Sequence, residues 1–277
     1  MHTIDELQHL MDSCEGLLFI FGAGMSVDSG IPDYRSGGGW YDAMSPFAQA
    51  GKDFLSILHG RELERNAPHA WGMWGIKQKL FGEAVLHAGY QVLMEVAAQK
   101  GSHSFVLTSN IDNLTIRVGF APERIHQCHG SIFQLQCRVP CTRTVWPMPN
   151  LDMKICYESL RAEGDLPHCP YCGAVARPNI YFFGDSEEKF VWEASQGSAT
   201  AFKHWLGEHG PQKLLMLEVG CGTGAPGLRR HAEQFLERFP QAHLVRINDV
   251  DATGPAERFT GIQGEAVHIL KHIKTAT

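Results

Sequence analysis

The feature that most constrains the fold is an apolar run that ends in a glycine turn. Residues 16–21, GLLFIF, carry no charge, and Gly22-Ala23-Gly24 follows them directly. A short, uniformly apolar run is typical of a strand buried on both faces of a parallel sheet. Glycines at the carboxyl end of such a strand let backbone amides approach the phosphates of a nucleotide, because no Cβ is in the way. The run therefore predicts the first strand of a doubly wound sheet with a nucleotide site at its end.

The remainder of the chain alternates in the same way. Further strands are expected at residues 104–110, 178–185, 213–220 and 242–248, and helices at 4–14, 88–101, 190–209 and 227–239. Strands that alternate with helices indicate an α/β fold, a Rossmann-like parallel sheet with helices on both faces.

Two cysteine pairs interrupt this alternation. Cys137 and Cys141 are spaced C-x3-C, and Cys169 and Cys172 are spaced C-x2-C. Two such pairs separated by a loop match a closed four-thiolate zinc site, with two disulfides as the alternative. Four thiolates leave no open position for water, so one structural Zn²⁺ per chain is expected. The other four cysteines are expected to be ordinary buried or loop residues.

These patterns divide the chain into two domains. A Rossmann-like domain is expected from residues 1–40, 83–135 and 175–277. A smaller domain is expected from a helical insert at 41–82 and a zinc-binding module at 136–174.

Charge and hydropathy narrow the possible partners. The chain has 277 residues and a formal net charge of −6, and it lacks a basic patch that would suit nucleic acid or an anionic membrane. It shows neither a signal-peptide pattern at residues 1–16 nor an apolar run of about 20 residues. We therefore expect a cytoplasmic protein that binds neither nucleic acid nor membrane.

The glycine turn continues into a longer motif that carries more information. Residues 22–35, GAGMSVDSGIPDYR, resemble the first motif of the sirtuins, the NAD-dependent protein deacylases, and depart from its usual form only at Tyr34, where phenylalanine is usual. Further segments resemble the family in the same order: TSNID at 108–112, CHGSI at 128–132, RPNIYFFGD at 177–185, VGCG at 219–222, RIND at 246–249 and GEAVHIL at 264–270. The four cysteines stand where the family keeps its zinc. Residues 41–82 are the least similar part.

The resemblance implies a deacylase with NAD as cosubstrate and an acyl-lysine protein or peptide as the other substrate. It implies three catalytic residues: His129 as general base, Asp112 at the nicotinamide carboxamide and Asn110 near the ribose. The implied substrate strand includes Ile180, Tyr181, Phe183 and Gly184. The implied cofactor-binding residues are Gly22, Ala23, Gly24, Ser26, Asp33, Tyr34, Arg35, Ser109, Asn110, Ile111, Asp112, Gly220, Cys221, Gly222, Asn248, Asp249 and Ala266.

Taken without the resemblance, the same residues have plainer interpretations. Asn110 is then a turn former, Asp112 caps the next helix, and His129 is one of 15 histidines.

Some positions depart from the sirtuin pattern. Ser109 replaces a glutamine, Tyr34 adds a hydroxyl, and Gly222 lacks the hydroxyl of the usual G-T-S, which together suggest a divergent branch. Deacylases that prefer acidic acyl groups carry Tyr-x-x-Arg in the helical insert. Trp74 and Lys77 stand there instead, so no strong preference for succinyl-lysine is expected.

Three other functions fit parts of the sequence. A protein ADP-ribosyltransferase or NAD hydrolase keeps the fold and changes the acceptor. A non-enzymatic NAD-sensing or zinc-scaffold module would bind NAD or zinc without catalysing a reaction. Residues 214–224, LLMLEVGCGTG, also resemble the first motif of S-adenosylmethionine methyltransferases, but the chain that follows is too short for the remaining elements of such a domain.

Overall fold

The computed structural model describes residues 2–33, 60–149, 153–182, 184–224 and 226–275. Tyr34, Arg35, Phe183 and residues 41–59 of the expected insert lie outside the described residues. Among those that are described, no helix combines the length and the apolar character that crossing a bilayer requires.

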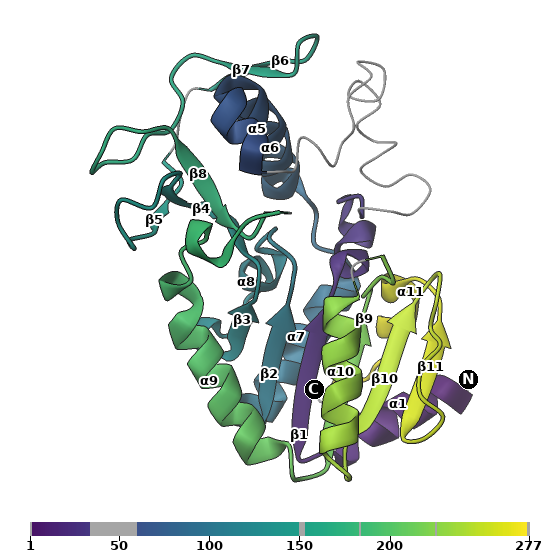
Figure 1. Cartoon of the computed structure of the whole chain (residues 1–277). Coiled ribbons are helices and arrows are strands. Elements are labelled where there is room, and N and C mark those ends of the chain that lie inside the picture. The colour runs from purple at the N-terminus through teal and green to yellow at the C-terminus, as the bar shows by residue number, and fades with distance from the viewer. Residues whose placement is uncertain (1, 34–59, 150–152, 183, 225, 276–277) are drawn as a thin grey trace.

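A six-stranded parallel sheet forms the centre of the larger part (Figure 1). Its spatial order is β3-β2-β1-β9-β10-β11, so the chain builds outward from β1 in one direction and from β9 in the other. The strands are β1 (Gly16–Phe21), β2 (Ser104–Thr108), β3 (Ile125–Gln127), β9 (Leu214–Val219), β10 (His243–Asn248) and β11 (Phe259–Gln263). This arrangement confirms the expected doubly wound fold, and it puts the topological switch point, where ligands bind in such sheets, between β1 and β9.

The alternation of side chains along β1 divides the interior into two cores. Leu17, Phe19 and Phe21 point to one face of the sheet, and Leu18 and Ile20 point to the other. The first face is covered by α1 (His2–Ser13), α7 (Ala88–Lys100) and α11 (Ala266–Leu270), and the second by α9 (Glu193–His209) and α10 (Gly227–Arg238). Because both faces are buried, every residue of β1 is apolar or glycine, as the sequence indicated.

Short elements complete the fold. They are the 3₁₀ segments η1 (Ala23–Ser29), η2 (Gly101–His103), η3 (Pro122–Arg124) and η4 (Glu187–Lys189), and the one-turn helix α8 (Leu114–Val118). Except for the strand expected at 178–185, the expected helices and strands are present with small shifts at their ends. The short β3 and α8 and the terminal β11 and α11 had no expected counterpart in the alternation pattern.

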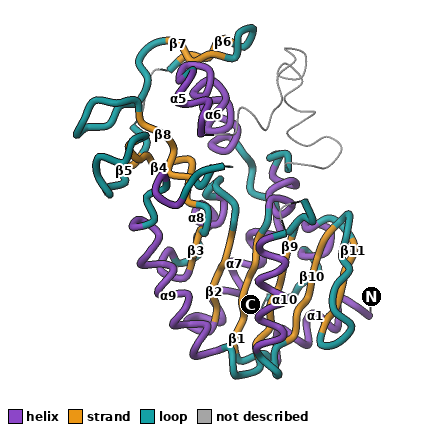
Figure 2. The backbone as a smooth tube through the Cα atoms, viewed as in Figure 1, coloured by secondary structure: helices purple, strands orange, loops and turns teal. Residues whose placement is uncertain are grey.

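A small lobe stands beyond the carboxyl edge of the large sheet (Figure 2). It holds an antiparallel sheet of β5 (Trp146–Pro147), β4 (Gly130–Cys137) and β8 (Ala176–Ile180), and a hairpin of β6 (Lys154–Cys156) and β7 (Arg161–Glu163). Helix α6 (Ala67–Glu83) packs on the hairpin and the sheet, and α5 (Gly60–Arg65) packs on α6. The Trp71 indole of α6 donates a 3.0 Å hydrogen bond to the Ala176 carbonyl oxygen, which ties helix to sheet.

Two boundaries drawn from the sequence fall inside this lobe. Residue 135 lies within β4, and 175 directly precedes β8, which pairs with β4 and not with the large sheet. The expected strand at 178–185 ends at Ile180, because Phe182 turns inward and its amide bonds to the carboxylate of Asp185.

Candidate active site

A buried polar network lies at the carboxyl ends of β1 and β2. The Ser26 hydroxyl of η1 is 2.7 Å from Asp112 Oδ2, and Asn110 Nδ2 donates to Ser26 Oγ at 3.2 Å and to the Gly22 carbonyl at 2.9 Å. All three side chains are at most 8% exposed. Three residues implied by the resemblance, from two separate motifs, therefore meet at one point beside the switch point.

The Asp112 carboxylate makes a structural hydrogen bond and can accept further hydrogen bonds. Its Oδ1 accepts the amide of Leu114, the first residue of α8, at 2.9 Å, although the N-cap position that the plainer interpretation gave to Asp112 is occupied by Asn113. Burial raises the pKa of the carboxyl, while the hydrogen bond from Ser26 opposes that rise. Each oxygen accepts one protein hydrogen bond and can accept another, so the carboxylate can bind an amide N–H such as that of nicotinamide.

The glycines of the two turns pack against each other. Gly22 N donates to Val219 O at 3.0 Å, and Gly24 N donates to Gly220 O at 2.9 Å. A Cβ at Gly22 would lie 2.5 Å from Gly220 O, and one at Gly24 would lie 2.7 Å from Gly220 Cα. The amides of Gly22 and Gly24 themselves have carbonyl partners inside the protein, and the approach of other backbone amides of this turn to phosphates stays a prediction. The glycines serve the close approach of the turns that follow β1 and β9.

Asn248 holds the opposite side of the switch point. Its Nδ2 donates to the Cys221 carbonyl at 3.1 Å, and its Oδ1 accepts the amides of Val250 and Asp251 at 3.0 Å. Asn248 therefore joins the turn after β9 to the turn after β10. Gly222 and Asp249 are exposed at the same edge.

The remaining implied cofactor residues lie nearby on several elements. Ala23 begins η1, Ser109 and Ile111 flank Asn110, and Ala266 begins α11. The amide that follows Ala266, that of Val267, donates to Asp28 of η1 at 2.9 Å, which brings α11 against the first turn. Asp33 is half-buried at the end of a described segment.

His129 connects the large sheet to the small lobe. Its ring contacts the Ser109 backbone at the end of β2, and its carbonyl oxygen accepts the amide of Tyr181 at 3.1 Å. His129 is exposed, yet the surrounding protein desolvates the imidazole, and this lowers its pKa below the ordinary histidine value, against the effect of the Ser109 contact. Gly130 follows with φ +76°, where a Cβ would lie 2.0 Å from Asn179 O.

The segment after β8 is held by a buried ion pair. Arg177 contacts both carboxylate oxygens of Asp185, NH1 to Oδ1 at 3.2 Å, and its guanidinium stacks 4.0 Å from the Phe182 ring. Tyr181 and Gly184 remain exposed, whereas Ile180 is buried and pairs with Gly130 in the small sheet.

The four motif cysteines converge. Their sulfur atoms all lie within 4.8 Å of one another, with Cys137 to Cys172 and Cys141 to Cys169 at 3.6 Å. A disulfide needs about 2.05 Å, whereas a tetrahedral zinc with bonds of about 2.3 Å separates its thiolates by about 3.8 Å. The cluster fits a structural Zn²⁺ and does not fit the disulfide alternative.

Comparison with known proteins decides the family. The sequence model of the Sir2 family matches residues 22–201. The chain belongs to the Sir2 family.

Relatives and solved structures agree with this assignment. An NAD-dependent protein deacetylase of Staphylococcus aureus strain NCTC 8325 is 29% identical over 186 residues, which is 66% of this chain and 68% of the relative. The Sir2 fold is shared with a Sir2 homolog–NAD complex, at a TM-score of 0.69 and 18% identity over 97% of this chain and 93% of the other. A Sir2–p53 peptide–NAD⁺ complex aligns with a TM-score of 0.66 and 19% sequence identity. The alignment covers 98% of this chain and 96% of the other.

Two residues of this Sir2-family site were missed by the sequence reasoning. Tyr90 of α7 reaches the network, and its hydroxyl is 3.0 Å from Ser26 Oγ. His87, the N-cap residue of α7, contacts η1 beside the network, with Nε2 2.8 Å from the Met25 carbonyl oxygen. His87 Nδ1 accepts the Gly89 amide, so Nε2 carries the ring proton and donates it to Met25. Neither position has a local pattern that would have singled it out.

The acidic residue within the methyltransferase-like motif is engaged inside the protein. Glu218, the acidic residue of that motif, is fully buried and forms a bidentate pair with Arg246, Nε to Oε1 at 2.6 Å and NH2 to Oε2 at 3.0 Å. It therefore faces the interior and not the turn.

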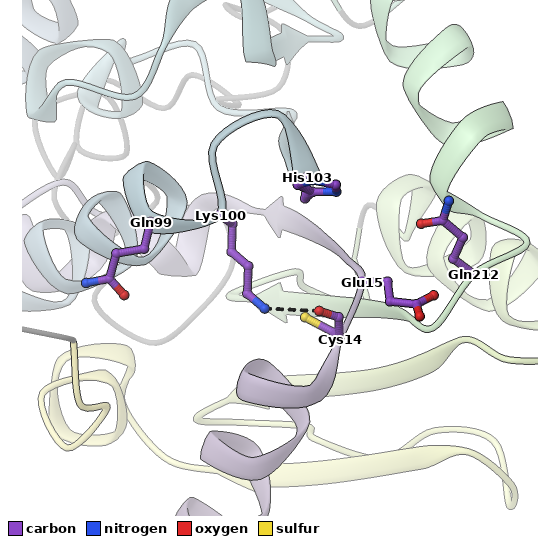
Figure 3. A pocket seen from close by; sticks show the side chains of 6 residues that line it. All are labelled: Cys14, Glu15, Gln99, Lys100, His103 and Gln212. Carbon is purple, nitrogen blue, oxygen red and sulfur yellow. Dashed lines mark hydrogen bonds between the residues drawn. The ribbon is translucent and has the colours of Figure 1, made fainter.

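A cavity of about 560 Å³ opens at the other end of the sheet (Figure 3). It is lined by Cys14, Glu15, Gln99, Lys100, His103 and Gln212. In it the Lys100 ammonium bonds to the Cys14 carbonyl at 3.0 Å. Because this cavity lies at the amino end of the strands, it is separate from the site at the switch point.

Proposed function

We propose that this Sir2-family chain is an NAD-dependent protein-lysine deacetylase that releases nicotinamide and O-acyl-ADP-ribose. The observation that carries the proposal is the junction at His129. Its main chain holds Tyr181, which belongs to the segment expected to bind acyl-lysine, and its ring meets Ser109, which belongs to the residues expected to bind NAD. The deacetylase name of the Staphylococcus aureus relative supports the same activity.

The proposed roles follow from the contacts. NAD, when bound, supplies the ADP-ribose that takes up the acyl group and the nicotinamide that leaves. Asp112 accepts the carboxamide N–H of nicotinamide, and Asn110 holds the Gly22 turn in place. A zinc ion held by Cys137, Cys141, Cys169 and Cys172 would have no open coordination position, so it would support the small lobe and take no part in the chemistry.

His129 is the proposed general base. Its lowered pKa keeps the imidazole neutral at pH 7, which is the form that can accept a proton from a ribose hydroxyl. A positioned base typically contributes about 10² to 10⁴-fold to the rate.

The peptide is proposed to pair with the exposed segment at Tyr181 and Gly184, beside the edge of the small sheet. The absence of a strong preference for succinyl-lysine remains our prediction. Lys77 is fully buried against the Trp74 ring, 5.0 Å from its centroid, which supports that prediction because a covered ammonium is poorly placed to meet an acyl carboxylate.

Two further sequence expectations are kept as proposals. The first is the division into a Rossmann-like domain and a small domain of helical insert and zinc module, supported by their separate sheets. The second is the cytoplasmic location, which fractionation of cells that make the protein can check.

The test is nicotinamide release by wild type and by His129→Ala, each with and without an acetyl-lysine peptide. We expect release by wild type to depend on the peptide and to yield O-acetyl-ADP-ribose. His129→Ala should lose free-lysine formation by at least about 10²-fold, because the step that leads to it needs the base. Some slow, peptide-dependent nicotinamide exchange should remain, because nicotinamide departs before that step.

A cleavage of NAD that ignores the peptide would contradict the proposal. Labelled protein as the product would then indicate an ADP-ribosyltransferase, and free ADP-ribose an NAD hydrolase. No nicotinamide release under any condition, with NAD binding intact, would indicate a binding module.

A further inference from the structure

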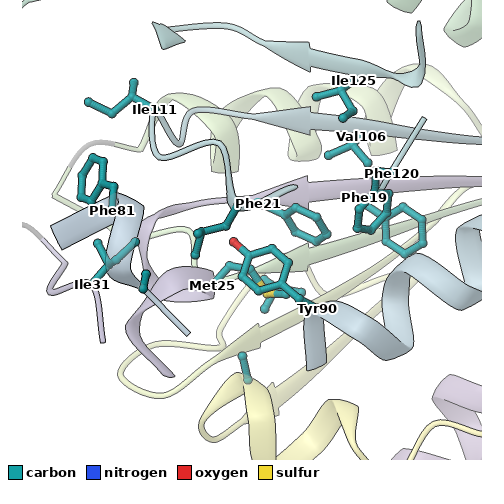
Figure 4. Close-up of a cluster of buried hydrophobic side chains, with 14 of the residues drawn as sticks. Phe19, Phe21, Met25, Ile31, Phe81, Tyr90, Val106, Ile111, Phe120 and Ile125 are labelled. Carbon is teal, nitrogen blue, oxygen red and sulfur yellow. The ribbon is translucent and has the colours of Figure 1, made fainter. Parts of the chain in front are cut away.

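The hydroxyl of Tyr90 is buried beside the residues expected to bind nicotinamide. Tyr90 is fully buried on α7, and its oxygen is 3.0 Å from Ser26 Oγ. Its ring packs edge-on against Phe21 of β1, with centroids 6.1 Å apart, and lies 4.9 Å from the His87 ring. Figure 4 draws the Tyr90 ring between Phe21 and Met25. The phenol oxygen points toward η1, where it meets Ser26.

The hydrogen bonds around Ser26 have one consistent direction. An ionised Asp112 only accepts, so the single Ser26 proton goes to Asp112 Oδ2 at 2.7 Å. The Asn110 amide donates to Ser26 at 3.2 Å. In its remaining hydrogen bond Ser26 Oγ must then be the acceptor, and the donor is the Tyr90 hydroxyl. The order of donation is Tyr90 to Ser26 to Asp112.

From this geometry we infer that Tyr90 is a positioning residue, which acts on Asp112 through Ser26. The inference rests on the proposed role of Asp112 at nicotinamide. Donation from Tyr90 polarises the Ser26 hydroxyl and strengthens its bond to the carboxylate, as chained hydrogen bonds do. The chain also holds Ser26 in one rotamer, so that Oδ2 presents a fixed acceptor direction. Arg117 also lowers the pKa of the Asp112 carboxyl through its charge, and this effect does not pass through Tyr90.

The test compares wild type with Tyr90→Phe, which removes only the hydroxyl. The first measurement is the pKa of the Asp112 carboxyl, followed by carbon-13 NMR across a pH titration and assigned with Asp112→Asn. We expect the pKa to be higher in Tyr90→Phe, because the anionic form loses support from the chain of donors. An unchanged pKa would overturn the inference. This measurement needs no catalytic activity.

The second measurement is kinetic. Tyr90→Phe should raise the nicotinamide inhibition constant and lower kcat/KM for NAD by about three- to tenfold, the value of one hydrogen bond. ADP-ribose affinity should stay within about twofold, because the nicotinamide contact alone is disturbed. Equal losses of nicotinamide and ADP-ribose affinity would indicate a purely structural tyrosine and overturn the inference.

Ser104→Ala is the matched control. It removes another buried hydroxyl, which bonds to Ala97 and Gly101 carbonyl oxygens at the amino end of β2. It should lower stability without changing the Asp112 pKa or the nicotinamide inhibition constant. If wild type failed to cleave NAD while the Asp112 pKa still rose in Tyr90→Phe, the proposed activity would be wrong and the positioning by Tyr90 would stand.

Discussion

The amide nitrogen of Gly24 donates a 2.9 Å hydrogen bond to the carbonyl oxygen of Gly220, and so fastens the turn after β1 to the turn after β9. The two strands are neighbours in the sheet, but 195 residues separate the turns in the chain. Gly220 has φ +67°, and a Cβ there would lie 2.2 Å from the Met25 amide nitrogen. The switch point therefore depends on glycine at a position that the family resemblance assigned to cofactor binding.

Gly220→Ala should destabilise the fold strongly. The left-handed backbone and the contact with backbone atoms both oppose a Cβ, and together they should lower the free energy of unfolding by about 2 to 4 kcal/mol. Gly222→Ala, two residues away with open space around it, should change the free energy of unfolding by less than about 0.5 kcal/mol. Denaturant titration of both variants checks this, and equal midpoints would refute it.

Removing the charge of Asp185 should loosen the segment at 181–184. In Asp185→Asn the Arg177 guanidinium stays buried without its counter-charge, which typically costs about 3 to 5 kcal/mol. We expect a raised KM for the acetyl-lysine peptide, with ADP-ribose affinity unchanged in calorimetry. Glu187→Gln removes an exposed charge two residues away and should alter neither quantity. A peptide KM that stays at the wild-type value in Asp185→Asn would show that the ion pair does not support the peptide segment.

The purified protein should contain one zinc per chain, measurable by metal analysis. Cys172→Ala should lose the metal and melt at a lower temperature, because at such sites the binding free energy is folding free energy. Cys156→Ala lies on β6, outside the cluster, and should keep both metal and stability. Full zinc content in Cys172→Ala would mean that the ion is bound elsewhere.

Lys77 should make stability depend on pH. Burial lowers the pKa of its ammonium from 10.5 to about 7, so between these values the unfolded chain holds a proton that the folded chain has released. The free energy of unfolding therefore rises as the pH increases from about 7 to about 10.

Lys77→Met should remove this dependence. The variant should be more stable than wild type at pH 7, by up to about 4 kcal/mol, and the difference should shrink toward pH 10. Lys79→Met replaces an exposed lysine of the same helix and should follow the wild-type curve. Unfolding titrations at several pH values check both, and a difference that stays constant with pH would contradict the burial argument.

The local patterns of the sequence determined the family, the alternation of strands and helices, and the zinc ligands. Each of these depends on residues a few positions apart: GLLFIF before Gly22, TSNID after a strand, and the spacing of the cysteine pairs. Hydrophobic period and ligand spacing express the geometry of one element, so they can be interpreted without knowing what packs against it.

Tertiary structure alone decided how the separate motifs meet. Tyr90 and Ser26 are 64 positions apart, and Gly24 and Gly220 are 196. Such contacts depend on the strand order and on which helix covers which face, and these arise from packing the whole chain. The physical reason is that the relative placement of two elements fixes which side chains meet across the core. The sequence of either element alone carries no signal for that placement.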